Sequence, residues 1–570
     1  MAGSTQAKPA VAKVFDIRVA VRVVRHISSG IYRTPAGALK ELVNNAFDSQ
    51  AAHVWIRTDH PEHRSIVVED DGNGMTEEVA EMTFRHVGAS LKTADPDSFP
   101  ITKHRRIIGM FGIGLLASAH ISKTITILSH PKGKDYSLRV DLDLSPYFEL
   151  INQTQPLEEF TFGTVKIQRV PRPPGARGTT VTLAKVEKDS NFYKALTRKS
   201  RARVRSKVPL ELMNWPSDDS PDEPGGSRMS SFIEAIDNWG VSSITRLDGR
   251  EYILWELALI APIEYLDGGP IDQRLLRGDV KQIVDDLVEK ARQWNFKVIF
   301  DGVELRKPIK LPSKKQRTTA ADRRDLAGEG DFQVVPIKFD FKTKTRHHVV
   351  ATGYVLWQPY HVVPEEIRGL YTRVSGVGLG PYENTLYKSI VGEDPLMRVQ
   401  VSGEMWIEEG LADAINLDRS GFIELDSDYQ ELKEKLTNFL GGEKDSVKTR
   451  VKRAKGAREN RRADQNASAE VAEATAQVST FMEQVREGYT VIDGQWDDIQ
   501  RAGTDADFET LCVYPSLLVD HKKKTVLVDF AELPAKAIIA ILTADEVLGT
   551  IPGGPKLRRR LSELLSRGMP

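Results

Sequence analysis

The segment ELVNNAFDSQ, residues 41–50, contains three polar residues whose side chains could take part in catalysis. A carboxylate such as that of Glu41 can accept a proton from water, and the oxygen of an amide such as Asn45 can bind a hard cation. In a helix, these two residues and Asp48 would lie along one side, because they are four and three residues apart. The alternative is that they form the solvated face of an ordinary amphipathic helix.

The elements around these residues have the pattern of an α/β domain, which is predicted over residues 14–185. A helix is expected around Glu41 because apolar residues recur there at three- and four-residue spacings and form a stripe that can be buried against a sheet. Short β-branched and apolar runs predict strands on its C-terminal side. The stripe consists of Leu39, Leu42, Val43 and Ala46, and the strands are at 54–58, 65–70, 124–129 and 179–186.

Three glycine-containing segments accompany the helix. In IVVEDDGNGMT (66–76) an apolar strand ends in acidic residues and a turn whose glycines allow close backbone approach to a ligand. In RRIIGMFGIGLLASA (105–119) glycines precede small and apolar helix formers, and such a loop can direct N–H groups at phosphate. ARGTTVTL (176–183) is a turn that leads into a strand. Each segment by itself also occurs as a purely structural turn.

In this order, the four motifs E-x-x-x-N, D-x-G-x-G, G-x-x-G-x-G and G-T resemble those of the GHKL ATPases. That superfamily includes DNA gyrase B subunits, heat-shock chaperones of the ninety-kilodalton class, histidine kinases and MutL mismatch-repair proteins. The resemblance spans about residues 20–185 and implies a Bergerat-type ATP-binding domain. The pattern of a P-loop is absent from the sequence, because its only Gly-Lys pair, Gly133-Lys134, is followed by Asp135.

The resemblance implies Mg²⁺-dependent hydrolysis of ATP to ADP and phosphate. Glu41 matches the glutamate that activates the attacking water, and Asn45 matches the asparagine that holds Mg²⁺. Asp70 matches the aspartate that accepts a hydrogen bond from the adenine amino group, whereas Asp71 is assigned no role. Asp48 could either orient the site or lie on the surface. The residues expected to contact the nucleotide are Asn45, Asp70, Gly72, Gly74, Met75, Lys92, Gly109, Gly112, Ile113, Gly114 and Thr179.

Residues 76–108 match the ATP lid of these proteins. The lid contains FRHVGASLKT, which resembles a segment of MutL-like proteins, and this likeness would bring Ser90 and Lys92 to phosphate when the lid closes. The alternative for Lys92 is an ordinary surface lysine.

A second α/β domain is predicted at 230–440, after a linker at 186–229. Its strand-like runs are YILWELALIA (252–261), FKVIFDGVEL (296–305), HHVVATGYVLW (347–357) and MRVQVSGEMWI (397–407). The segment INLDRSG (415–421) resembles the catalytic loop in the middle, or transducer, domain of the ninety-kilodalton chaperones. The resemblance implies that Arg419 contacts the γ-phosphate, with Arg373 and Lys388 as weaker rivals and a surface arginine as the alternative.

The C-terminal region is expected to be largely helical. Residues 443–487 are charged, rich in alanine and free of proline, which predicts a long solvated helix. Within it, the basic run at 448–462 could bind the phosphate backbone of DNA, although a solvated helix face is the simpler interpretation. Residues 488–570 are expected to form a small domain for dimerisation or for docking a partner.

Length and composition are those of a multidomain globular protein. The 570 residues exceed what one hydrophobic core supports, and 28% of them are charged, with a net charge of −1. The single cysteine, Cys512, excludes an intramolecular disulfide and a multi-cysteine metal site. No apolar run has the length of a membrane helix or a signal peptide. A cytoplasmic protein without membrane contact is therefore expected.

These observations lead to one main hypothesis of function and two alternatives. The main one is an ATP-gated homodimeric clamp that remodels a protein client, most similar to the ninety-kilodalton chaperones. The first alternative is a DNA-associated clamp of the MutL, MORC or topoisomerase B kind. The second is a nucleotide-sensing component of a multiprotein defence system.

Overall fold

The computed structural model divides the chain into two compact units, Met1–Ala454 and Lys455–Pro570, and each is described by itself. The residues that it describes are 13–20, 35–85, 105, 118, 121–146, 159–199, 212–216, 226–311, 331–380, 398–416, 421–442, 444–461, 463–464, 490–493, 508–510, 517–520, 525–528 and 559.

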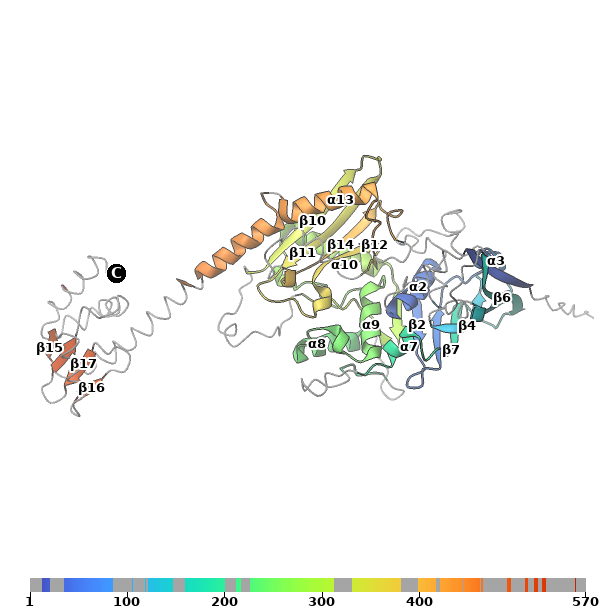
Figure 1. Ribbon diagram of the computed structural model, residues 1–570, viewed down its shortest axis with the longest axis horizontal. Helices are drawn as coiled ribbons and strands as arrows, with labels where there is room; N and C mark the ends of the chain where they lie inside the picture. Colours follow the sequence, from blue (N-terminus) through green and yellow to red (C-terminus); the bar gives the residue numbers. More distant parts are fainter. Residues whose placement is uncertain are drawn as a thin grey trace, which may run out of the picture. The chain divides into compact units, whose positions relative to one another are not determined.

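A nine-stranded sheet forms the centre of the first half of unit 1 (Figure 1). All its neighbouring strands are antiparallel except β2 and β8. The four strands predicted from the sequence are confirmed as β2, β3, β4 and β7. In spatial order the strands are β1 (Lys13–Ala20), β6 (Glu159–Pro171), β5 (Tyr136–Asp143), β4 (Ser122–His130), β7 (Gly178–Val186), β3 (Ser65–Asp70), β2 (His53–Arg57), β8 (Lys297–Phe300) and β9 (Val303–Glu304).

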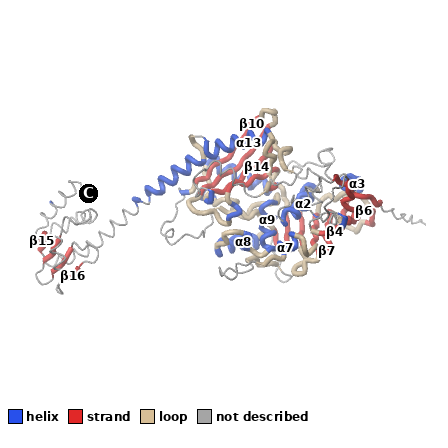
Figure 2. Tube along the Cα trace, in the orientation of Figure 1, coloured by secondary structure: helices blue, strands red, loops and turns tan. Residues whose placement is uncertain are grey.

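Helix α2 (Pro35–Asp48) has the predicted apolar stripe, and all four of its residues are at most 5% exposed. It packs against α9 (Gly249–Ile260), and α7 (Asn191–Leu196) lies beside both helices (Figure 2). The prediction of a strand at 252–261 is wrong, because this segment lies in α9. Nearly every side chain of α9 from Ile253 onward is buried, so its sequence lacks the polar face that identifies a helix.

The predicted linker at 186–229 contains packed structure. Helix α7 lies within it, and the amides of Leu212 and Met213 donate hydrogen bonds to Oε1 of the buried Glu251. The strand β8, from the predicted second domain, pairs in parallel with β2 of the predicted first domain. The two predicted domains therefore share one sheet.

A second sheet has the order β10 (Gln333–Lys342), β11 (His348–Trp357), β14 (Val401–Glu409), β12 (Gly369–Val374) and β13 (Val377–Gly378). One face packs on α10 (Gly278–Gln293). The other contributes to a core with α13 (Ser427–Thr437) and the helical residues 447–454. The remaining named elements of unit 1 are α3 (Glu77–Arg85), α8 (Ser227–Trp239), short 3-10 helices at Ile244–Arg246, Gln273–Leu275 and Glu365–Ile367, and a π-helical turn at Asn438–Gly442.

In unit 2 the structure describes a four-stranded sheet. Its order is β15 (Thr490–Asp493), β18 (Thr525–Val528), β17 (Leu517–Asp520) and β16 (Phe508–Thr510). These strands lie in a region where mainly helix was expected. The mixed α/β fold class is confirmed for the protein. None of the helices in the described ranges is long and apolar enough to cross a membrane.

Candidate functional site

Two of the three candidate residues on helix α2 are buried. Glu41 and Asp48 are each 8% exposed, whereas the side chain of Asn45 is exposed. The interpretation of a solvated face is therefore wrong for two of the three residues, and the surface alternative for Asp48 is wrong. Lys40 Nζ lies 3.7 Å from Glu41 Oε1. A buried carboxylate beside a cation on the same helix is unusual for a purely solvated surface.

The turn after β3 is hydrogen-bonded to the C-terminal end of α2. The amide of Asn73 donates to the carbonyl of Ser49 over 2.8 Å, and the amide of Ser49 donates to the carbonyl of Asn45 over 3.0 Å. A Cβ atom at Gly72 would lie 2.1 Å from Ser49 Oγ, so only glycine fits this close approach. The D-x-G-x-G turn and the end of α2 thus meet directly.

Asp70 is the titratable group at the centre of this junction. Its Oδ1 accepts a hydrogen bond from the Gly72 amide over 2.8 Å. Burial raises the pKa of Asp70 to about 6, although hydrogen bonds from Gly72, Thr179 and Ser49 act in the opposite direction. Asp70 is therefore mainly ionised at pH 7 and can accept a hydrogen bond from a ligand.

Asp71, to which the sequence motif assigns no role, holds the beginning of β2. Its Oδ1 accepts hydrogen bonds from the amides of Ala52 and His53 over 2.7 and 2.9 Å, and Oδ2 lies 3.0 Å from His53 Nδ1 and 3.3 Å from Arg177 Nη2. Burial would raise the pKa of Asp71, but the hydrogen bonds from His53 and Ala52 outweigh it and lower that pKa. Asp71 is thus a structural anion.

Strand β7 completes the junction. Thr179 Oγ1 lies 2.9 Å from Ser129 Oγ, which accepts a hydrogen bond from the Met75 amide over 2.7 Å. Gly178 has a φ of +76°, and a Cβ there would lie 1.8 Å from the carbonyl oxygen of Asp70. The structure therefore brings together Asp70, Gly72, Met75 and Thr179 as the sequence analysis expects.

The residues that sequence reasoning missed are Ser49, Ser129 and Arg105. Ser129 is the last residue of the predicted strand 124–129, and it faces Thr179 in the register of β4 and β7. That pairing is non-local and has no signal in the sequence. Ser49 is one turn after Asn45, where the helical spacing could have indicated it.

Several predicted site residues lie outside the described residues. These are Lys92, Gly109, Gly112, Ile113, Gly114 and Arg419, together with Ser90 of the lid and Lys388, a rival of Arg419. The other rival, Arg373, is fully buried, and its Nε donates to Glu404 Oε1 over 2.7 Å. Its guanidinium is therefore engaged in the core and is not a surface group that could reach a phosphate.

The described residues fit a nucleotide with its cation. Glycine at 72 allows the turn after β3 to pack closely on Ser49, and glycine at 178 allows β7 to pack closely on the carbonyl of Asp70. Asp70 supplies an ionised acceptor, and the exposed amide of Asn45 supplies the oxygen donor that Mg²⁺ prefers. This donor set suits one adenine and one hard cation.

Comparison with known proteins agrees with this geometry. Residues 32–164 match the family model described as "Histidine kinase-, DNA gyrase B-, and HSP90-like ATPase". The chain is similar to the DNA mismatch repair protein MutL of Afipia carboxidovorans, with 32% identity over 124 residues that cover 21% of this chain and 19% of that protein. The same protein of Rhodopseudomonas palustris is 34% identical over 122 residues, which cover 21% and 20%. That of Bacteroides fragilis is 28% identical over 120 residues, which cover 21% and 18%.

The chain thus spans about a fifth of the length of these curated relatives. The comparisons support a GHKL-type ATPase domain in the matched segment. The relatives named here are mismatch-repair proteins, so they give no support to a closer kinship with the ninety-kilodalton chaperones.

Proposed function

We propose that unit 1 binds ATP with Mg²⁺ where α2, the turn after β3 and the start of β7 meet, and that it hydrolyses ATP to ADP and phosphate. The observation that carries this proposal is the hydrogen-bonded junction of α2, the turn after β3 and the start of β7. The amide of Asn73 donates a hydrogen bond to the carbonyl of Ser49, directly after α2, and Met75 is linked through Ser129 to Thr179 of β7. This junction unites three of the four motifs that the resemblance requires.

Three residues, Asp70, Asn45 and Glu41, each have a definite part in the proposal. Asp70 accepts the hydrogen bond of the adenine amino group, which selects adenine over guanine. Asn45 holds Mg²⁺, which when bound offsets negative charge on the phosphates. Glu41 accepts a proton from the water that attacks the γ-phosphate. Its low exposure of 8% keeps this carboxylate away from bulk solvent.

ATP turnover and nucleotide affinity test the proposal directly. The wild-type chain should hydrolyse ATP, and Glu41→Ala should bind ATP but turn it over at least about 100-fold more slowly. Asp70→Asn should lose affinity, because its amide presents an N–H group where an acceptor is needed. Turnover can be followed by phosphate release, and binding by calorimetry.

Glu69→Gln is the matched control, because Glu69 precedes Asp70 on β3 and pairs only with the exposed Arg57 among its described ion pairs. It should behave as wild type. A wild-type chain that neither binds nor hydrolyses ATP would overturn the proposal. Binding without turnover would instead favour the nucleotide-sensing alternative.

The proposal includes an ATP-gated dimer. Two copies should associate when ATP is bound and separate after hydrolysis, so Glu41→Ala should accumulate as a dimer in ATP but not in ADP. Light scattering measures the mass in each state. An unchanged mass in all nucleotide states would exclude the clamp while leaving ATP hydrolysis intact.

DNA is the second candidate partner, and a specific surface favours it. Residues 448–461 contain seven basic residues and one acidic residue. This helix buries Val447, Val451 and Ala454 against the core of the second sheet, while Lys452 and Arg453 are exposed. A docked helix with a basic outer face can gain affinity for a phosphate backbone by releasing counterions.

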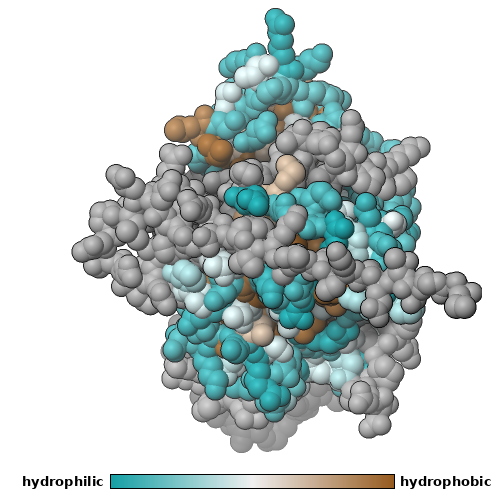
Figure 3. All heavy atoms as spheres, turned by 90° about the vertical axis from the view of Figure 1, so that its right-hand side faces the viewer, coloured by the Kyte–Doolittle hydropathy of each residue, from teal (hydrophilic) through white to brown (hydrophobic). Residues whose placement is uncertain are grey.

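A protein client has less support from the described surface. Figure 3 shows that the described side chains on the face it views are mainly hydrophilic, with small separate hydrophobic spots. A broad apolar patch for an unfolded client is therefore not described on this face. Stimulation of ATP turnover by an unfolded protein, and not by DNA, would nevertheless favour the chaperone alternative.

Binding of a fluorescent DNA duplex at several salt concentrations tests the second candidate. Replacing Lys452 and Arg453 with glutamine should weaken binding and reduce the slope of log affinity against log salt by about 1 to 2. The matched control replaces Lys281 and Arg292, which are exposed basic residues on α10. Equal loss in both double variants would argue against a site on this helix.

A further inference from the structure

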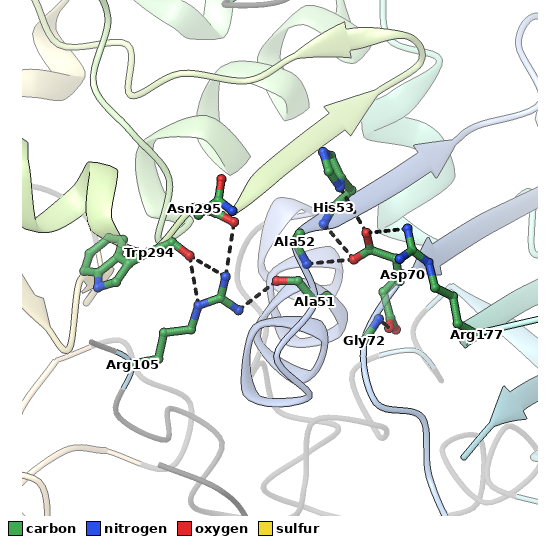
Figure 4. A network of polar contacts seen from close by, with 10 residues as sticks. Ala51, Ala52, His53, Asp70, Gly72, Arg105, Arg177, Trp294 and Asn295 are labelled. Carbon is green, nitrogen blue, oxygen red and sulfur yellow. Dashed lines mark hydrogen bonds and ion pairs between the residues drawn. The ribbon is translucent and has the colours of Figure 1, made fainter. Parts of the chain in front are cut away.

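Arg105 is a buried cation whose described hydrogen bonds all go to backbone carbonyls. It is 9% exposed. Its Nε donates to the carbonyl of Trp294 over 3.0 Å, Nη1 donates to that of Ala51 over 2.7 Å, and Nη2 donates to those of Trp294 and Asn295 (Figure 4). One guanidinium thus connects two segments that are far apart in the sequence.

The carbonyls that Arg105 binds follow two helices. Ala51 comes just after α2, and Nη1 also contacts the carbonyl of Phe47 in the last turn of that helix at 3.5 Å. Trp294 is the C-cap of α10. Helix C-termini carry unsatisfied carbonyls and a partial negative charge, so a cation between two of them is favourable. Burial nevertheless lowers the pKa of Arg105 from its ordinary value.

Aromatic rings surround this connection. The guanidinium carbon lies 4.8 Å from the centre of the Phe47 ring, which packs edge-on against Trp294 at 5.9 Å. Trp294 in turn stacks on Trp406 of β14, with ring centres 5.5 Å apart and an angle of 11° between the planes. Arg105 therefore lies where α2, the end of α10 and the second sheet meet.

The position of Arg105 matters for the nucleotide site because α2 carries Asn45. Phe47 is two residues after Asn45, and Ala51 is in the next turn of chain. A shift of the end of α2 would move Asn45 and the Ser49 carbonyl that holds the D-x-G-x-G turn. Errors of about 1 Å at such positions are costly for binding and catalysis.

We propose that Arg105 is a positioning residue for the nucleotide site, which holds the end of α2 against the segment between α10 and β8. This inference rests on the proposed binding of ATP. The required group is a planar fork, because its nitrogens must reach carbonyls on two segments at once. A lysine ammonium is a point donor on a flexible stem and cannot reproduce this geometry.

Steady-state kinetics of Arg105→Lys in the full chain tests the inference. The KM for ATP should rise at least tenfold, and kcat should fall as well, because α2 also carries Glu41. A merely structural role would reduce the fraction of active protein, which lowers the apparent kcat and leaves KM unchanged. Arg368→Lys is the matched control, since Arg368 Nε also donates to a carbonyl, that of Val362, in a part of unit 1 that holds no motif residue.

Phe47→Leu keeps the inference testable if Arg105 variants fail to fold. It removes the ring beneath the guanidinium but retains a large apolar side chain, and it should raise KM by about twofold to fivefold. An unchanged KM in Arg105→Lys, or in Phe47→Leu where the former does not fold, would overturn the inference. Failure of wild type to bind ATP would instead overturn the proposed function.

Discussion

Asp70 and Asp71 are adjacent in the chain, but their environments shift their pKa values in opposite directions. Burial dominates at Asp70 and raises its pKa to about 6. At Asp71 hydrogen bonds from His53 and Ala52 outweigh burial and lower the pKa. Such a separation between neighbouring carboxylates marks different tasks. Asp70 is suited to accept a hydrogen bond from a ligand, whereas the carboxylate of Asp71 is already used in hydrogen bonds that stabilise the fold.

The affinity for ATP should depend on pH through Asp70. In the proposed function the ionised carboxylate accepts the hydrogen bond of the adenine amino group, so the affinity for ATP should be constant well above pH 6 and fall as the pH drops below it. The limiting decrease from one proton is about tenfold per pH unit. Calorimetry from pH 5 to 8 measures this profile.

Asp70→Asn is the control for that profile, because it lacks the titrating group and should remove the part of the pH dependence that belongs to Asp70. An identical pH dependence in both proteins would assign the effect to the nucleotide phosphates instead.

The nucleotide-free protein should become more stable when Asp70 is replaced by asparagine. The pKa of Asp70 is higher in the folded protein than its ordinary value of 3.8, so its contribution to stability is fully present below about pH 4 and is lost as the pH rises through about 6. Asp70→Asn should therefore raise the free energy of unfolding at pH 8 by up to about 3 kcal/mol. Urea denaturation at pH 5 and 8 should show the larger gain at pH 8, and a loss of stability at pH 8 would contradict this account.

Asp71→Ala should destabilise the protein and reveal the structural role of this carboxylate. The substitution leaves the amides of Ala52 and His53 without the acceptor that now lies 2.7 and 2.9 Å away. Hydrogen bonds to charged groups contribute about 1.5 to 3 kcal/mol each, so a loss of about 2 to 3 kcal/mol is expected. The thermal unfolding midpoint should fall accordingly. A midpoint equal to that of wild type would show that solvent replaces the carboxylate without cost.

Gly178→Ala should separate β7 from the end of β3. The new Cβ would lie 1.8 Å from the carbonyl oxygen of Asp70, and the φ of +76° adds backbone strain of about 1 kcal/mol. Thermal stability and ATP affinity should both decrease. Gly175→Ala is the matched control, because its φ is +72° but no atom lies within 4 Å of the added Cβ. Similar losses in the two variants would mean that strain, and not the close approach, decides the outcome.

Removing Arg373 should strongly destabilise unit 1. Its ion pair with Glu404 is fully buried, and the hydroxyls of Tyr265 and Tyr354 also donate to Glu404 over 2.8 and 2.9 Å. Arg373→Met leaves a buried carboxylate without its counterion, which costs about 3 to 5 kcal/mol. Urea denaturation measures this loss.

Arg57→Met is the control for the buried pair. Arg57 also pairs with a glutamate of a neighbouring strand, Glu69, but both side chains are exposed. Its loss should cost less than about 1 kcal/mol. Equal effects of Arg57→Met and Arg373→Met would indicate that burial does not strengthen the inner pair.

The local elements of the site can be predicted from the amino-acid sequence. The spacing of apolar residues in α2 and the apolar runs of β2, β3, β4 and β7 are short-range patterns. Each can be recognised without knowledge of the elements that it packs against. The glycines at 72 and 178 could be located for the same reason, since a turn motif occupies a few consecutive residues. These patterns are sufficient to predict the α/β class, and the resemblance of their motifs to those of the GHKL ATPases makes Asp70 and Asn45 candidates.

The contacts between those elements, in contrast, depend on long-range packing in the folded protein. The pairing of β2 with β8 joins residues that are more than 200 positions apart, and no local pattern encodes it. The same holds for the carbonyls that Arg105 binds and for the contact of Ser129 with Thr179. The sequence of α9 resembles that of a strand, because burial on nearly all sides removes the polar periodicity of a helix. The periodicity of the sequence indicates which face of an element is buried. Long-range packing determines the element against which that face is buried.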